Sequence, residues 1–163
     1  MCGLLGMLAA TGDVDKYVDA LERSLPCMRH RGPDAAGTWH DGDAAFGFNR
    51  LSIIDLEHSH QPLRWGPEDQ PDRYALTFNG EIYNYVELRE ELKGLGYTFH
   101  TEGDGEPIVV GYHHWGKDVV NHLRGMFGIV IWDTHTKTMF AARDQFGIKP
   151  LYYATTDAGT VFA

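Results

Sequence analysis

The second residue of the chain is a cysteine, in the segment Met1-Cys2-Gly3-Leu4-Leu5-Gly6. Removal of the initiator methionine would leave the Cys2 thiol and the α-amino group of the chain on one residue. An α-amine has a pKa of about 7.7–8.0, so part of it is unprotonated near neutral pH and can accept the thiol proton. A nucleophile paired with an N-terminal amine is an activated arrangement in enzymes. Taken alone, however, a cysteine here is more often a small buried residue than a catalyst.

Two charged residues lie where a charge needs a partner. Arg50 is surrounded by apolar residues in the segment 44–54, and a buried guanidinium needs an anion or a route to solvent. A substrate carboxylate is one such anion, and an internal Asp or Glu is the commoner one. Asp104 lies between two glycines, where it could cap a helix, bind a metal or receive an ammonium group. In isolation, a helix cap is the commonest of these roles.

Asn79-Gly80 is a candidate group of hydrogen-bond donors. It follows the predicted strand Tyr74–Phe78 and precedes a predicted helix. Side-chain and backbone N–H groups at such a junction can point at developing negative charge. An ordinary Asn-Gly turn is the commoner interpretation of the dipeptide alone. The segment 29–34, which contains two arginines, likewise has the composition of a solvated turn.

The composition is that of one globular domain. The 163 residues are 43% hydrophobic and 12% aromatic, which is enough to bury a sizeable core. Fourteen Lys and Arg residues against 23 Asp and Glu residues give a formal net charge of −9, which argues against nucleic acid and anionic membrane partners. The chain has two cysteines, and it lacks both a signal-like N-terminus and an apolar run that could span a bilayer. These features predict a cytoplasmic location.

The pattern of apolar residues predicts stacked sheets with helices outside them. Segments typical of strands are 3–10, 36–42, 44–54, 74–78, 97–101, 127–132, 138–142 and 160–163, with a further strand shortly after 150. Helices are expected at 13–25, 84–95, 107–115 and 118–123. Asp13 would cap the first helix, and Asn84 with Glu87 would start the second as a capping box. Residues 58–73 are expected to form a polar loop.

Six short motifs stand in register along the chain: MCGLLG, MRHRGPD, NRLSIID, FNGEIYN, DGE and RDQFGIKPLYY. In this order and spacing they resemble the glutaminase domain of asparagine synthetases, which are class II glutamine amidotransferases among the N-terminal-nucleophile hydrolases. Each motif is weak by itself, but six in register with a second-position cysteine extend the resemblance over essentially the whole chain.

The resemblance implies an α+β fold, a four-layer αββα sandwich of two mainly antiparallel sheets. Residues 1–163 would form one type-2 glutamine amidotransferase domain that hydrolyses glutamine to glutamate and ammonia. Ammonia would pass through a tunnel to a C-terminal synthetase domain in cis, which is absent from this chain. ATP and Mg²⁺ are expected in that domain, whereas no cofactor and no metal are expected in this one. A homodimer is an assembly that the resemblance allows.

The resemblance also implies the residues that carry out the chemistry. Cys2 looks like the nucleophile, with its α-amine as base and later proton donor. Asn79 and the Gly80 N–H look like the oxyanion hole. Arg31 resembles a residue that steadies the segment of the nucleophile.

Other residues resemble those that bind the substrate. Arg50 is similar in place to the residue that binds the substrate carboxylate, assisted by backbone of the residues that follow it: Leu51, Ile53 and Ile54. Asp104 and Glu81 resemble the groups around the α-ammonium. An α-amino acid requires one cation and one anion, which Arg50 and Asp104 would supply.

Gly103 and Gly105 depart from the family pattern, in which a hydroxyl residue or cysteine often stands beside the aspartate. This departure is expected to loosen the turn.

Two other functions compete with an asparagine synthetase glutaminase. The first keeps glutamine hydrolysis but delivers ammonia to another carboxylate, such as diaminopimelate of cell-wall precursors. The second is a degenerate domain with a regulatory or docking role. The presence of Cys2, Arg50, Asn79 and Asp104 argues against the degenerate domain.

Overall fold

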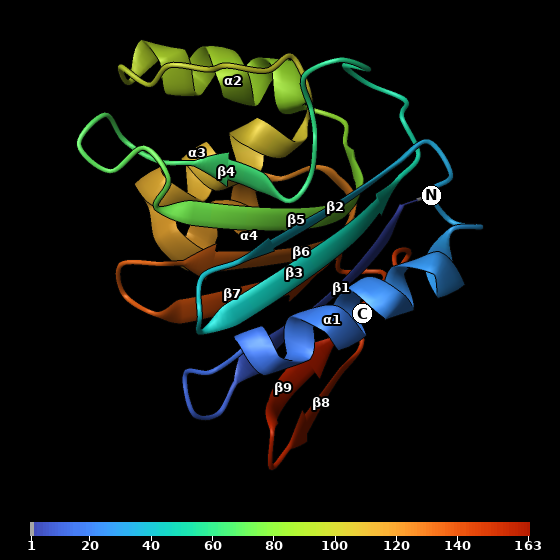
Figure 1. The fold of residues 1–163 in the computed structure, drawn as a ribbon. Helices are drawn as coiled ribbons and strands as arrows, with labels where there is room; N and C mark the ends of the chain where they lie inside the picture. The colour runs from blue at the N-terminus through green and yellow to red at the C-terminus, as the bar shows by residue number, and fades with distance from the viewer. Residues whose placement is uncertain (1) are drawn as a thin grey trace.

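Two antiparallel sheets form the centre of the structure (Figure 1), a computed structural model that describes residues 2–163. The five-stranded sheet has the order β2 (Ala35–His40), β3 (Ala44–Arg50), β1 (Gly3–Ala9), β9 (Gly159–Phe162) and β8 (Tyr153–Thr156). The four-stranded sheet has the order β4 (Leu63–Trp65), β5 (Tyr74–Ile82), β6 (Gly125–Asp133) and β7 (Thr138–Arg143). The expected removal of Met1 concerns a residue outside the described ones.

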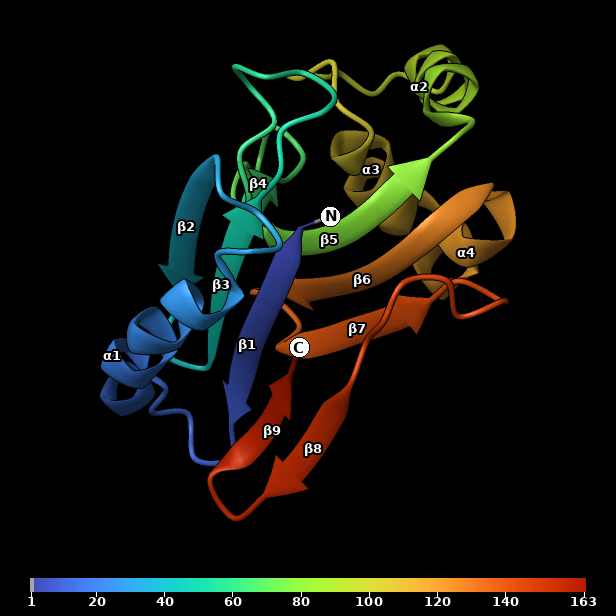
Figure 2. The same cartoon turned by 90° about the vertical axis from the view of Figure 1, so that its right-hand side faces the viewer.

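Helices cover the outer face of each sheet (Figure 2). Helix α1 (Asp15–Ser24), continued by the short η1 (Leu25–Met28), packs on the five-stranded sheet. The other sheet carries α2 (Tyr85–Gly94), α3 (Gly105–Trp115), η2 (Gly116–Asp118) and α4 (Val119–His122). This order of layers confirms the predicted αββα sandwich. Within residues 2–163, no helix is both long and apolar enough to cross a membrane.

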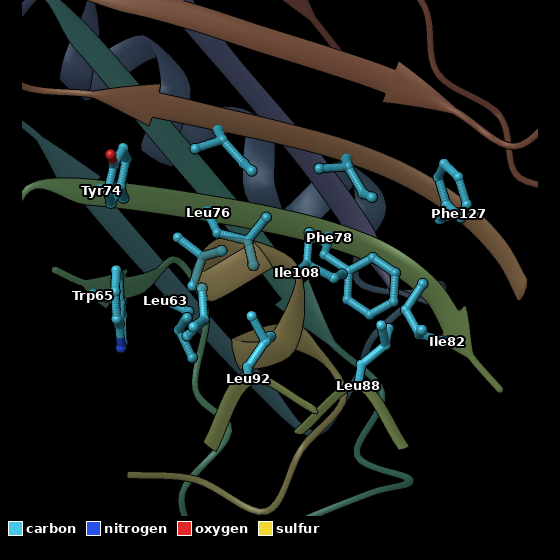
Figure 3. Packing of buried hydrophobic residues seen from close by; sticks show 14 residues of the cluster. Leu63, Trp65, Tyr74, Leu76, Phe78, Ile82, Leu88, Leu92, Ile108 and Phe127 are labelled. Atoms are coloured by element: carbon cyan, nitrogen blue, oxygen red, sulfur yellow. The ribbon is translucent and has the colours of Figure 1, made fainter. Parts of the chain in front are cut away.

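Alternation of side chains along the strands divides the described core into three clusters, one of which lies between α1 and the five-stranded sheet. Between the sheets, Phe46 and Phe48 of β3 pack in one cluster with Trp132 of β6. A second core lies between the four-stranded sheet and its helices, where Figure 3 shows Leu88 and Leu92 of α2 and Ile108 of α3 beneath β5, with Leu76, Phe78 and Ile82. Because Phe78 points toward the helices, the next residue, Asn79, points into the space between the sheets.

The strand that contains Arg50 is shorter than the predicted 44–54. It ends at Arg50 because the chain then turns back and brings the carbonyl oxygens of Ile54, Asp55 and Leu56 to the Arg50 guanidinium. The segment after Arg50 is therefore a loop wrapped around a buried charge.

Asn79 and Gly80 lie inside β5, and the predicted junction between a strand and a helix is wrong. The strand continues because β6 runs alongside it, with Asn79 opposite Gly128 and Gly80 opposite Phe127. A Cβ atom on residue 80 would lie 2.1 Å from the Met126 carbonyl oxygen. Glycine is thus required here by the close approach of β6, and the turn propensity of Asn-Gly is overridden by pairing.

Residues 97–101 are not a strand, contrary to the prediction. The N–H groups of His100 and Thr101 donate to the carboxylate of Glu106 at 2.7–3.0 Å, so they are not available to a neighbouring strand. The Tyr97 N–H bonds to the Leu92 carbonyl oxygen at the end of α2. The segment is a loop because a buried side chain satisfies its backbone.

The predicted polar loop at 58–73 contains the short strand β4, which pairs with the first residues of β5. Leu63 and Trp65 are buried, whereas Arg64 between them is exposed. A pattern of three residues beside Pro62 is too short to be recognised in the sequence.

Both predicted helix caps are absent. Asp13 forms an ion pair with Lys16 at 3.5 Å, and the N-cap position of α1 carries no side-chain hydrogen bond. The Asn84 side chain bonds to the backbone of His122 and Arg124 at 2.9 and 2.8 Å. The Asn84 side chain therefore bonds to residues that are distant in the sequence, and it does not cap α2 as the local pattern predicts.

Candidate active site

A cleft of about 170 Å³ opens between the sheets beside the start of β1. Its walls include residues from β3, the loop after β3, β5 and the start of α3. The cleft contains all the residues for which the sequence implies a catalytic or substrate-binding role: Cys2, Arg50, Leu51, Ile53, Ile54, Asn79, Gly80, Glu81 and Asp104. Arg31 lies in a neighbouring cavity that shares Cys2 and Asn79 with the cleft.

Cys2 precedes β1 and packs against the core between the sheets. The Leu51 N–H donates to its sulfur at 3.3 Å, and the thiol lies 3.6 Å from the Leu51 carbonyl oxygen. Arg31 Nε donates to the Cys2 carbonyl oxygen at 3.1 Å and so fixes the backbone at this position. Burial raises the pKa of the Cys2 thiol, although the Leu51 N–H and the charge of Arg50 oppose that effect. The thiol consequently needs a base to become a nucleophile at neutral pH.

The edge of β5 presents backbone N–H groups to the cleft at every second residue. The Phe78 N–H donates to the side-chain oxygen of Gln61 at 2.6 Å. Four residues further along the same edge, the Ile82 N–H donates to the Asp104 carboxylate at 3.0 Å. The two acceptors, the side chains of Gln61 and Asp104, line the cleft, so this edge of β5 faces the cleft.

Gly80 lies midway between these two residues, and its N–H points to the same edge. The opposite residue, Phe127, uses its own backbone groups on the far side, where Asp144 N–H donates to its carbonyl oxygen and the Asp144 carboxylate accepts from its N–H. Gly80 and Phe127 are thus a pair without hydrogen bonds between them. Within residues 2–163 the Gly80 N–H has no partner, which leaves one backbone donor directed into the cleft.

The side chain of Asn79 supplies a second donor. The residue is only 3% exposed, and its side-chain amide makes no hydrogen bond to any residue from 2 to 163. Asn79 lines both the cleft and the neighbouring cavity, as does Cys2. The amide is not among the fully buried polar groups that lack a partner, so it is reached from the cleft that Asn79 lines. An accessible amide beside the Cys2 thiol is placed to donate to a bound ligand.

Arg50 is 6% exposed and donates to three backbone oxygens, at 3.1 Å to Ile54, 2.5 Å to Asp55 and 3.1 Å to Leu56. Among the described residues, no Asp or Glu forms an ion pair with it, so the alternative of an internal carboxylate is wrong. Carbonyl dipoles orient the guanidinium but leave its charge unneutralised. This makes the site suitable for an anionic ligand.

Asp104 stands at the N-cap position of α3 but does not cap it, because its carboxylate bonds to Ile82 of β5 instead. Burial raises the pKa of Asp104 to about 6, with the nearby Glu81 adding to the rise and the Ile82 N–H opposing it. Because burial disfavours the ionised form of Asp104, a cationic ligand bound beside it would stabilise that form.

Among the lining residues that the sequence does not assign to the site, three have polar side chains: Ser59, Gln61 and Lys149. Gln61 bonds to both backbone groups of Phe78, at 2.6 and 3.1 Å, and so replaces a strand partner at the edge of β5. It stands in a polar loop without periodicity, and only its distant partner reveals its role. Lys149 lies in the RDQFGIKPLYY motif, but the motif alone does not place it in the cleft.

The sequence profile of the glutamine amidotransferase domain family matches residues 1–163. The chain belongs to this family. A Mycobacterium tuberculosis (strain ATCC 25618 / H37Rv) protein, provisionally named a glutamine-hydrolysing asparagine synthetase, is 57% identical over 174 residues, which cover 100% of the chain and 27% of that protein. Glutamine-hydrolysing asparagine synthetase 1 of Bacillus subtilis (strain 168) is 44% identical over 168 residues, covering 100% of the chain and 26% of that protein. The amidotransferase chain thus spans about a quarter of the length of these relatives.

Two solved structures share the fold. The glutamine phosphoribosylpyrophosphate amidotransferase of B. subtilis, complexed with ADP and GMP, superposes with a TM-score of 0.73 at 20% identity, over 99% of this chain and 41% of that one. An enzyme described as the allosteric regulatory enzyme of purine biosynthesis gives a TM-score of 0.76 at 20% identity, with the same coverage. The likeness confirms the fold predicted for the amidotransferase domain.

We expect Asp104→Asn to stabilise the free amidotransferase domain while weakening its substrate binding. A carboxyl group whose pKa of about 6 in the folded state exceeds its ordinary value of 3.8 makes the folded state bind more protons between these values. The free energy of unfolding therefore falls as pH rises through this window. A shift of this size corresponds to at most about 3 kcal/mol at pH 7. Denaturant unfolding from pH 4 to 8 should show that the free energy of unfolding of the variant, relative to that of the parent protein, increases between pH 4 and 6.

The exposed Asp19→Asn of α1 serves as the control for the removal of one carboxylate. An Asp104→Asn variant that is less stable than the parent protein at pH 7, or whose advantage does not change with pH, would contradict the assigned cost of this buried charge.

Proposed function

We propose that this amidotransferase domain hydrolyses the side-chain amide of glutamine, with Cys2 as the nucleophile. The observation that carries the proposal is a pair of donors that have no partner among residues 2–163, the Gly80 N–H and the Asn79 amide, in the cleft that also holds the Cys2 thiol. Acyl transfer through a thiol requires such donors, because the carbonyl oxygen becomes an anion in the tetrahedral intermediate.

The reaction begins when the free α-amine of processed Cys2 takes the thiol proton. The thiolate attacks the amide carbon, and the carbonyl oxygen becomes an oxyanion that accepts bonds from Gly80 and Asn79. The C–N bond then breaks, and ammonia leaves with a proton from the α-ammonium. Water, deprotonated by the same amine, attacks the remaining thioester, releases glutamate and restores the thiol.

The two charged residues of the cleft bind the α-amino acid end of the substrate. Arg50 pairs with the α-carboxylate, and its three carbonyl partners aim the guanidinium before the substrate arrives. Asp104 pairs with the α-ammonium, with Glu81 nearby. Leu51, Ile53 and Ile54 line the path between these ends. Arg31 acts indirectly by holding the Cys2 backbone.

In the whole protein, the ammonia would serve a synthetase domain in cis. The relatives that match the full chain carry the name asparagine synthetase and are roughly four times longer than the matched region. We therefore propose that residues 1–163 are the glutaminase domain of an enzyme that makes asparagine from aspartate with ATP and Mg²⁺ bound elsewhere in the protein.

The test is glutaminase activity of the protein after removal of Met1, verified by mass. Glutamine should yield glutamate and ammonia in equal amounts, while asparagine, one methylene shorter, should be a poor substrate because its amide carbon cannot reach the sulfur when both ends of the amino acid are bound. Absence of glutamine-dependent ammonia from protein with a free Cys2 amine would refute the proposal.

A further inference from the structure

The two groups assigned to the substrate's charged ends belong to different parts of the fold. Arg50 ends β3 of the five-stranded sheet, whereas Asp104 precedes α3, which packs on the four-stranded sheet. The α-carboxylate and α-ammonium of one amino acid are separated by a fixed short distance. Binding both therefore requires that the segment after Arg50 and the segment before α3 be held at a fixed separation.

Asp55 is bonded to both segments. Its carbonyl oxygen accepts from Arg50 Nη2 at 2.5 Å. One oxygen of its carboxylate accepts from the His58 N–H at 3.0 Å, and the other accepts from the Ser59 hydroxyl at 3.1 Å and from the Glu102 N–H at 2.8 Å. Within residues 2–163, the Asp55–Glu102 bond is the sole hydrogen bond between residues 51–59 and residues 97–104.

The backbone at Asp55 has a φ of 47°, in the left-handed region that non-glycine residues rarely adopt. The side chain is 5% exposed although it belongs to a surface loop. Burial by itself raises the pKa of Asp55, but the N–H groups of Glu102 and His58 and the Ser59 hydroxyl outweigh it and lower the pKa to about 2. The residue is thus an ionised acceptor whose carboxylate and conformation are both specified by the loop.

A close approach supports the same junction. A Cβ atom on residue 103 would lie 1.9 Å from Ser59 Oγ, so the two loops touch where residue 103 has no side chain. On the other side, Arg89 of α2 donates to the Gly103 carbonyl oxygen at 2.8 Å and pairs with Glu102. For Gly103, the expected loosening of this turn is therefore wrong, since the absent side chain lets Ser59 pack against it.

We propose that Asp55 is a positioning residue for the substrate, which sets the separation between Arg50 and Asp104 by bonding to the loops that carry them. The inference rests on the proposed glutaminase function. It assigns no contact between Asp55 and glutamine.

The test is steady-state glutaminase kinetics of Asp55→Asn, an isosteric change that replaces one acceptor oxygen with a donor. The KM for glutamine should rise roughly ten- to a hundredfold while kcat changes less than about threefold, because the cost falls on binding of the charged ends and not on the thiol or the oxyanion donors. Asp41→Asn is the matched control. Asp41 is likewise a hydrogen-bonded acceptor of a strand-connecting loop, but it lies outside the cleft and holds Trp132 Nε1 and the backbone of the β2–β3 turn.

Two electrophiles separate positioning from general damage. Iodoacetamide, which lacks the α-amino acid group, should alkylate Cys2 at the parental rate in Asp55→Asn. The glutamine-like diazoketone 6-diazo-5-oxo-L-norleucine should label Cys2 at least about tenfold more slowly at subsaturating concentration, because it must bind through its charged ends. Equal slowing of both reagents, or an unchanged KM, would overturn the proposal.

A second pair of variants covers the case in which Asp55→Asn does not fold. Gly103→Ala should push the loops apart and raise KM about tenfold, and adding Ser59→Gly should restore at least half of that change by removing the clashing atoms. A rise in KM that Ser59→Gly leaves untouched would contradict the junction. Failure of the glutaminase proposal itself would instead appear in the parent protein, as absence of both turnover and diazoketone labelling.

Discussion

Replacing Cys2 with alanine should lower glutamine hydrolysis to the uncatalysed background, a loss on the order of 10⁴-fold or more, because no other group can form the thioester. The fold should survive, since Cys2 is only partly buried at the edge of the inter-sheet core. Thermal unfolding and ammonia release, measured on the same preparation after Met1 removal, would check both statements.

Cys27→Ala is the matched control for this variant. Cys27 is the other cysteine of the chain, it is exposed, and it lies in η1 outside the cleft. Its removal should leave turnover unchanged, and a glutamine-like electrophile should label Cys2 but not Cys27. Labelling of Cys27 with loss of activity, or full activity in Cys2→Ala, would remove Cys2 from the mechanism.

Replacing Asn79 with alanine should reduce kcat by about a hundred- to a thousandfold, the scale seen for single oxyanion donors, with little change in KM. The physical reason is that the Asn79 amide has no hydrogen-bond partner among residues 2–163 and would gain one as the carbonyl oxygen becomes an anion. Asn79→Asp should be as poor or worse, since it replaces an N–H donor with a negative charge facing the oxyanion. Steady-state kinetics of both variants would measure the effect.

Asn49→Ala provides the comparison for Asn79→Ala. Asn49 is equally buried, at 3% exposed, but its side-chain N–H group donates to the Leu25 carbonyl oxygen at 2.6 Å, away from the cleft. Its loss should lower stability without a comparable fall in kcat. A near-normal kcat in Asn79→Ala would leave Gly80 as the one assigned donor and would require another group for the oxyanion.

Much of the candidate site could be predicted because it depends on residue type and local context. Cys2 is a candidate because of its place in the chain, and the six motifs in register favour a nucleophile over a small buried residue. Arg50 is recognisable because a charge among apolar residues must be compensated. Asn79, Gly80 and Asp104 could be named as donors and acceptor from their motifs, and the structure gathers all five residues in one cleft. The layer order likewise follows from which segments are apolar on one face or on both.

The tertiary structure decided how those residues are used. Pairing with β6 converts Asn79-Gly80 from an expected turn into a strand, and the edge of this strand leaves the Gly80 N–H without a partner in the described part of the chain. No local pattern encodes which edge that is. The bond of Asp104 to Ile82 displaces the expected helix cap for the same reason, because its partner lies 22 residues away. Asp55 and Gln61 could not be found from the sequence, since their partners Glu102 and Phe78 are 47 and 17 residues distant. Local patterns report burial and donor type, whereas the pairing of a polar group with a distant one depends on the folded chain.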